Sequence, residues 1–143
     1  MRKGNLRRPF APGRVRENRT RYFAARLPEA TRAGLESYAR LHRLSASAAA
    51  AHLLEEALRA ARFPGIDFRW EPSGRRAHVT GTGLAAWELH MIWVGHGRSA
   101  AKVLKGYPHL TASQVHAGAA YIEAYPEEYP SSARPEFART LKA

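Results

Sequence analysis

The sequence contains no cysteine and only one aspartate, Asp67, among its 143 residues. Without cysteine the chain can form no disulfide, thiolate zinc site, iron–sulfur cluster or cysteine nucleophile. A single aspartate beside eleven glutamates also leaves little material for a catalytic carboxylate pair or a Ser–His–Asp triad. We therefore expect a protein that is not an enzyme and that binds no cofactor.

Long apolar runs are absent as well. The most apolar stretch, residues 46–58, is interrupted by His52, Glu55 and Glu56, whereas a membrane span needs roughly 18 uninterrupted apolar residues. The charged start of the chain is not followed by an apolar segment of the kind that secretory signals contain. These absences predict a protein without a membrane partner, located in the cytoplasm.

Metal-ligand and nucleotide-binding patterns are also missing. Paired ligands on a helix stand three or four positions apart, but the nearest histidine pairs are His90 with His96 and His109 with His116. Residues 81–86 match a GxGxxA pattern, yet they lack the acidic residue that dinucleotide sites place about 20 positions later. We expect no metal site, and we interpret the glycine-rich run as a turn that enters a helix.

Acidic residues are scarce near the start of the chain. Lysine and arginine number 23 against 12 acidic residues, and nine of these cations but only one acid, Glu17, fall within residues 1–26. Such a concentration of positive charge predicts contacts with nucleic-acid phosphates; the alternative is a solvated tail that only improves solubility. The expected phosphate contacts in this part of the chain are Arg2, Lys3, Arg7, Arg8, Arg14, Arg16, Arg19 and Arg21.

The first half of the chain divides into an arm and a small domain. Residues 1–19 contain glycine and proline without a helical or alternating pattern, which predicts a basic disordered arm. Residues 20–27 alternate as a strand does, and two helices follow, the second with Ser47 as its N-cap. A strand with two unpaired edges has no partner within residues 20–62. We therefore expect this domain to form a homodimer through the strand.

A second domain is expected after the breaking sequence Phe63-Pro64-Gly65. Two alternating runs, residues 66–70 and 75–80, predict a β-hairpin. Three helical segments follow the hairpin, which is typical of a helix-turn-helix arrangement.

The third of these helices has the clearest start. Thr111 and Gln114 form the pattern of a capping box, and Pro126 ends the helix. The second domain is thus expected over residues 63–125, and residues 126–143 are expected to be a flexible tail. The predicted fold class is mainly α with short β elements (α+β).

Residues 21–59 resemble the ribbon-helix-helix family of DNA-binding proteins. The resemblance is carried by Tyr22-Phe23-Ala24-Ala25-Arg26-Leu27-Pro28-Glu29, Leu35, Tyr38, Ser45-Ala46-Ser47 and Leu53-Leu54. It implies that two chains pair their strands into an antiparallel ribbon in the major groove of double-stranded DNA, where Tyr22, Ala24 and Arg26 contact bases. It also implies a phosphate contact at the backbone amides of Ser47 and Ala48. Arg43 departs from this pattern, because the family usually has glycine between the helices.

Residues 64–129 resemble the bacterial domain-of-unknown-function family 433. The matching residues are Gly65-Ile66-Asp67-Phe68-Arg69, Gly74-Arg75-Arg76-Ala77, Gly81-Thr82, Leu84, Trp87, Tyr107-Pro108-His109-Leu110-Thr111, Gln114-Val115 and Ala120-Tyr121. The resemblance implies a winged or helix-turn-helix-like fold and, in many members, an antitoxin that acts beside a PIN-like toxin nuclease. Gly83 stands where many relatives have arginine.

Charge and resemblance together predict a dimeric, sequence-specific DNA-binding protein, namely a bacterial transcriptional regulator of the antitoxin type that associates with the nucleoid when bound. The helix after Thr111 is a candidate second reader of bases. Its candidate contacts are Ser113, Gln114, His116 and Ala117. The alternative is a protein-interaction module that neutralises a toxin nuclease, with DNA binding secondary. Trp70 fits either core packing or base stacking.

Overall fold

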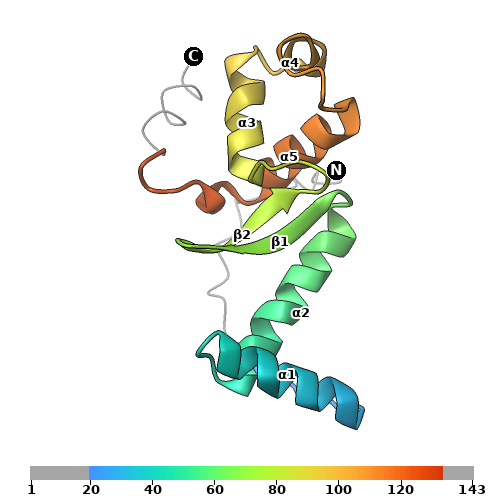
Figure 1. Ribbon diagram of the computed structural model, residues 1–143, viewed down its shortest axis with the longest axis vertical. Helices are drawn as coiled ribbons and strands as arrows, with labels where there is room; N and C mark the ends of the chain where they lie inside the picture. Colours follow the sequence, from blue (N-terminus) through green and yellow to red (C-terminus); the bar gives the residue numbers. More distant parts are fainter. Residues whose placement is uncertain (1–19, 134–143) are drawn as a thin grey trace, which may run out of the picture.

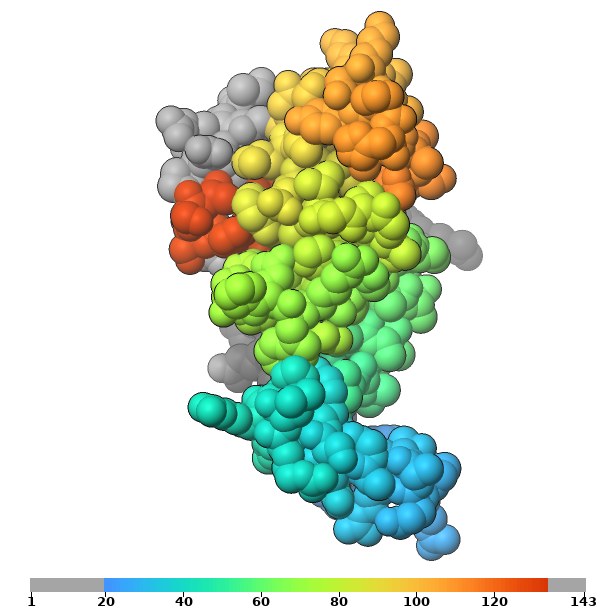
Figure 2. All heavy atoms as spheres, viewed as in Figure 1, coloured from blue at the N-terminus to red at the C-terminus, as the bar shows by residue number. Residues whose placement is uncertain are grey.

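The computed structural model describes residues 20–133, which form five helices, one two-stranded sheet and a 3₁₀ turn (Figure 1). The elements are α1 Glu29–Leu41, α2 Ala46–Arg62, β1 Ile66–Glu71, β2 Gly74–Val79, α3 Ala86–Gly95, α4 Ala100–Gly106, α5 Ala112–Ala124 and η1 Pro126–Glu128. The mainly helical α+β class is confirmed. Helix α1 and the first half of α2 project from a larger body, which contains the sheet and α3–α5 (Figures 1 and 2).

The strand expected over residues 20–27 is absent. Residues 20–28 carry no regular secondary structure, and their side chains are exposed. A strand is defined by hydrogen bonds to a neighbouring strand, and the only sheet in the described part of the chain is the β1–β2 hairpin. The single chain offers this segment no partner, so the expected pairing of two strands from two copies stays a prediction.

The turn between α1 and α2 differs from the expectation in one detail. Helix α2 begins at Ala46, and Ser45 is its N-cap, because its Oγ accepts a hydrogen bond from the Ala48 amide at 3.0 Å. Ser47, the expected N-cap, lies inside the first turn. Sequence alone could not separate two serines two positions apart. Arg43 reverses the chain just before this cap with a φ of +55°.

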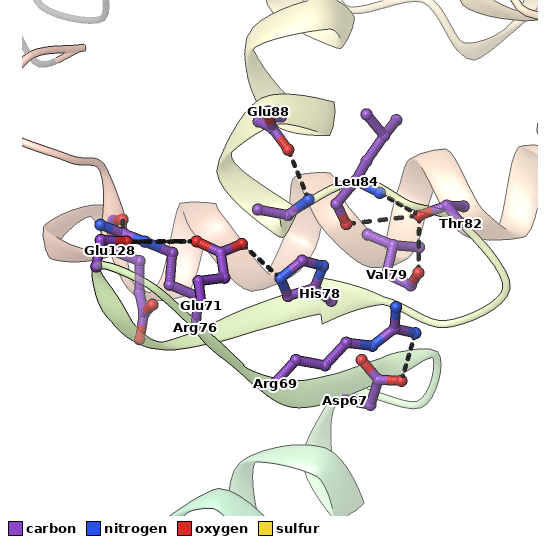
Figure 3. Close-up of polar contacts among 12 residues, drawn as sticks. Asp67, Arg69, Glu71, Arg76, His78, Val79, Thr82, Leu84, Glu88 and Glu128 are labelled. Atoms are coloured by element: carbon purple, nitrogen blue, oxygen red, sulfur yellow. Dashed lines mark hydrogen bonds and ion pairs between the residues drawn. The ribbon is translucent and has the colours of Figure 1, made fainter.

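The hairpin separates an apolar face from a polar one because side chains alternate along a strand. Ile66 pairs with Val79 and Phe68 with Ala77, which places these apolar residues on the face that packs into the core. On the polar face, the Glu71 carboxylate lies between two β2 side chains (Figure 3). It is 2.7 Å from His78 Nε2 and 3.2 Å from Arg76 Nε.

The glycine-rich run after β2 forms the turn that enters α3, as interpreted from the sequence. Gly81 has a φ of +78°, a conformation that glycine adopts without strain. Thr82 Oγ1 donates to the Val79 carbonyl at 2.8 Å and accepts from the Leu84 amide at 3.1 Å. The Glu88 carboxylate then accepts from the Ala85 amide at 2.8 Å, which caps the helix (Figure 3).

The core lies where α3 and α5 cross behind the sheet. Leu89, Val115, Tyr121 and Ile122 are fully buried there. Gly118 permits the close approach of the two helices, since a Cβ at this position would lie 3.0 Å from Leu89 Cδ2. Helix α5 is therefore firmly seated, with one side in the core and the other toward solvent.

The segment after α5 is not the loose tail that the sequence suggested, at least as far as residue 133. Tyr129 is 2% exposed and Ala133 is 8% exposed, and both belong to the core cluster. The prolines end α5 and redirect the chain, but the aromatic side chain between them supplies buried contacts. Residues 134–143 lie outside the described part of the chain.

Candidate nucleic-acid interface

A junction of charged side chains fixes α2 against the body, and this positions the two candidate DNA-contacting regions relative to each other. The Arg59 guanidinium donates to Tyr121 Oη at 3.1 Å and to Glu128 Oε1 at 3.0 Å. The central carbon of this guanidinium, Cζ, also lies 4.0 Å from the centre of the Tyr125 ring. Arg59 is thus held by residues of α5, of η1 and of the junction between them.

A second set of contacts joins the hairpin to α1 and α2. The Arg75 guanidinium donates to both carboxylate oxygens of Glu56, with the shortest bond to each at 2.9 and 3.0 Å. Trp70 stacks on His42 with ring centres 4.1 Å apart and donates to Tyr38 Oη at 3.2 Å. Trp70 is therefore neither fully buried nor available as a free stacking platform, because one ring face and its nitrogen serve this junction.

The three expected base-contacting residues of the first region all lie on the surface. Tyr22 is 94% exposed, and Ala24 and Arg26 are exposed too. Arg26 and Leu27 line an open cleft of about 600 Å³ that is closed on its other side by α1 and the start of α2. The arginines and lysine expected at positions 2–19 lie outside the described residues, whereas Arg21 is described and exposed.

The start of α2 presents fewer amides than the resemblance implied. Ser47 and Ala48 are exposed in the first turn. The Ala48 amide, however, already donates to Ser45 Oγ, so a phosphate there would compete with the cap. Ser47, one residue earlier in the first turn, is the better placed of the two.

The four candidate readers on α5 do not share one surface. Ser113 and His116, three positions apart, are exposed on the same side of the helix. Gln114 instead accepts from the Thr111 amide at 2.9 Å, which confirms the capping box. Its side chain also donates to the Thr80 carbonyl at 3.2 Å, so both ends of the amide group already have partners within the chain. Ala117 packs at the start of the hairpin, where a Cβ on Gly65 would lie 3.2 Å away.

Sequence reasoning missed two cations on the helix that precedes these readers. Lys102 and Lys105 are exposed on α4, the helix that precedes α5. The signal that identifies them is the absence of any acidic residue between Glu88 and Glu123.

Sequence reasoning also missed a buried polar chain that ties residues 126–133 to the body. Tyr129 Oη lies 2.5 Å from His90 Nδ1, and His90 Nε2 lies 3.0 Å from Glu123 Oε1. Burial lowers the pKa of His90, so this side chain is neutral near pH 7. The hydrogen bond from His90, assisted by Arg98, lowers the pKa of the Glu123 carboxyl. This arrangement holds α3, α5 and the following segment together.

Two further properties concern the described residues only. Within residues 20–133, no three histidine or acidic side chains gather in a way that would hold a metal ion. No helix in that range has the length and apolar character needed to cross a bilayer.

Comparison with known protein families gives one match, which covers part of the chain. Residues 71–122, from the end of β1 to near the end of α5, match the family described as "Protein of unknown function (DUF433)". The resemblance seen in the second half of the sequence is thereby confirmed for this region. No curated protein and no solved structure matches the chain.

Proposed function

We propose that this protein is a dimeric, sequence-specific DNA-binding protein, a transcriptional regulator of the antitoxin type whose residues 20–62 pair with those of a second copy. The observation that carries the proposal is an apolar surface on this region, which adjoins the most basic part of the sequence. The antitoxin assignment rests on the family resemblance of residues 64–129.

Large apolar side chains are exposed mainly in the first domain. Six of the eight large apolar residues that are exposed in the described part of the chain fall within residues 20–62. They are Tyr22, Phe23, Leu27, Leu41, Leu54 and Leu58. So much apolar surface on a small domain marks an interaction site. Covering it with a second copy would also give residues 20–27 the strand partner that they lack.

Helix α2 carries a seam suited to pairing with itself. Ala51, Leu54, Leu58 and Ala61 are spaced at intervals of three and four residues, and all four are exposed. The opposite sides of α2 are occupied by α1 and by the body. If two α2 helices run antiparallel, each Leu54 meets a Leu58 and each Ala51 meets an Ala61. The seam is therefore complementary to its own copy, as a two-fold interface requires.

The turn between α1 and α2 supports the ribbon-helix-helix geometry. Arg43 occupies the position at which the resembled family usually has glycine, and it adopts a φ of +55°. This left-handed conformation is the one that glycine adopts most easily at the C-terminal end of a helix. The chain thus follows the backbone path of a glycine turn although the residue is arginine.

The DNA-binding part of the proposal rests on charge and exposure. Nine cations against one acid in residues 1–26 provide the sequence-independent attraction to phosphates. Arg26 is exposed in the same segment, and arginine can donate two hydrogen bonds to guanine. We propose that Arg26 contributes to base recognition and that the preceding cations hold the backbone.

The dimer is tested with Leu54→Glu/Leu58→Glu, with Met91→Glu on α3 as the control for adding charge at an exposed apolar residue. Sedimentation of the native chain should give a dimer, the double variant a monomer with weakened DNA binding, and the control an unchanged dimer. A folded native monomer at micromolar concentration would overturn the dimer.

Base recognition is tested with Arg26→Ala. Loss of a bidentate base contact should weaken binding to the selected site by about 1–3 kcal/mol and change binding to random DNA less. Arg69→Ala, which removes a cation paired with Asp67 in the hairpin, is the charge-matched control. The site itself is obtained by sequencing DNA fragments that co-purify with the protein. Equal losses on both DNAs would refute the role of Arg26.

A further inference from the structure

The second half of the chain contains a long stretch without negative charge. No acidic residue occurs from position 89 to position 122. The same stretch carries three permanent cations and four histidines. The cations are Arg98, Lys102 and Lys105, and the histidines are His90, His96, His109 and His116.

The fold gathers part of this stretch on one end of the body. Helix α4, the connection to α5 and the first half of α5 lie together there (Figures 1 and 2). Five exposed polar side chains belong to this α4–α5 surface: Lys102, Lys105, His109, Ser113 and His116. Lys102 and Lys105 are three positions apart on α4, and Ser113 and His116 are three positions apart on α5. Because residues three apart are neighbours on a helix surface, each pair shares one side of its helix.

The α4–α5 surface lacks the anchors of a protein-binding site. Protein interfaces are centred on buried aromatic or aliphatic side chains. Among the described residues, every large apolar side chain that is exposed lies outside residues 92–133, and the nearest in sequence is Met91 on α3. A surface with cations and hydrogen-bonding groups but without apolar anchors suits a polyanion.

We propose that the α4–α5 surface is a second DNA-binding surface, in which Lys102 and Lys105 contact phosphates while Ser113 and His116 approach the groove. This inference rests on the proposed function, because it assigns a further part of the chain to the same DNA. In helix-turn-helix proteins the first helix of the pair crosses the backbone and the second enters the major groove with its N-terminal residues. Helices α4 and α5 follow that order.

The charges on α5 fix the direction of approach. Glu123 lies at the far end of α5, where its carboxylate is paired with His90 and Arg98. Arg98 is therefore already paired with a carboxylate at that end. The N-terminal half of α5, which follows Lys102 and Lys105 in the chain, carries no carboxylate, so it is the half that a DNA backbone can approach.

Lysine footprinting tests this surface directly, because the sequence contains only four lysines, at positions 3, 102, 105 and 142. The full chain is acetylated with and without a short random-sequence DNA duplex, and each lysine is followed by mass spectrometry. DNA at low salt should slow acetylation of Lys102 and Lys105 several-fold, and high salt should remove this protection. Protection of Lys3 without protection of Lys102 and Lys105 would overturn the α4–α5 surface while leaving the proposed function intact. Failure to form any complex would overturn the proposed function itself.

A matched pair of variants gives an independent test. Each phosphate contact contributes about 0.9 to the slope of log affinity against log salt concentration. Lys102→Gln/Lys105→Gln should therefore lower the slope by just under two, whereas Lys102→Arg/Lys105→Arg should retain it. Both positions are exposed, so circular dichroism should show an unchanged fold. A native slope in the glutamine variant would contradict the proposal.

Discussion

Replacing Arg59 by alanine should destabilise the protein by about 2–4 kcal/mol, because it breaks the junction between α2 and the body. The side chain is only 19% exposed, and it donates to Tyr121 and Glu128 and covers the Tyr125 ring. Its two hydrogen bonds contribute about 0.75–1.5 kcal/mol each, within the net range of typical intramolecular hydrogen bonds, and the cation–π contact adds about 0.5–1 kcal/mol, which gives about 2–4 kcal/mol in all. The variant also leaves Glu128, 22% exposed, without its cation.

Urea denaturation at a fixed protein concentration measures this loss, since the stability of a dimer depends on concentration. Arg62→Ala is the control, because Arg62 lies one turn later on the same helix and is exposed; its effect should stay within about 0.5 kcal/mol. Arg59→Lys keeps the positive charge but lacks the planar guanidinium, so its loss of stability should lie between those of Arg59→Ala and Arg62→Ala. If Arg59→Ala is as stable as the Arg62 control, the junction does not hold α2 in place.

Three further changes test other parts of the structure. Arg43→Gly should raise the free energy of unfolding by about 0.5–1 kcal/mol by relieving the positive φ, whereas Arg43→Ala should not. Gly118→Ala should cost about 1–3 kcal/mol because its Cβ would lie 3.0 Å from Leu89 Cδ2, whereas Gly34→Ala on open α1 should be neutral or stabilising; thermal denaturation ranks both pairs. Burial lowers the pKa of His90 in the folded protein, so the unfolded chain takes up the proton first and stability should fall as pH drops below about 6.5. Urea titrations across this range should show a shallower fall in His90→Asn, and an equal fall would contradict a buried neutral His90.

Features that depend on neighbouring residues could be predicted from the sequence. The hairpin followed from two alternating runs around a turn, and the start of α5 followed from Thr111 and Gln114 three positions apart. Both are governed by contacts within a few residues, so local residue types are sufficient to indicate them.

Features that depend on distant contacts could not be predicted. Arg59 and Glu128 are 69 positions apart, and nothing near either residue indicates the other. Gln114 was predicted to contact bases, because nothing near it in the sequence indicates that its amide donates to the carbonyl of Thr80, just after β2. Tyr129 resembled part of a tail because the sequence does not show that His90 lies beside it. The strand expected over residues 20–27 depends on a second chain.

Native mass spectrometry of the full chain with a DNA duplex of its selected site tests the central claim most directly, because it reports DNA binding and stoichiometry together. Each chain has a mass of 15.9 kDa. We predict a complex whose mass exceeds that of the free duplex by the mass of two chains. A complex of the duplex with one chain should not be abundant. A duplex that stays free of protein, or that binds a single chain, would contradict the account of a dimeric DNA-binding protein.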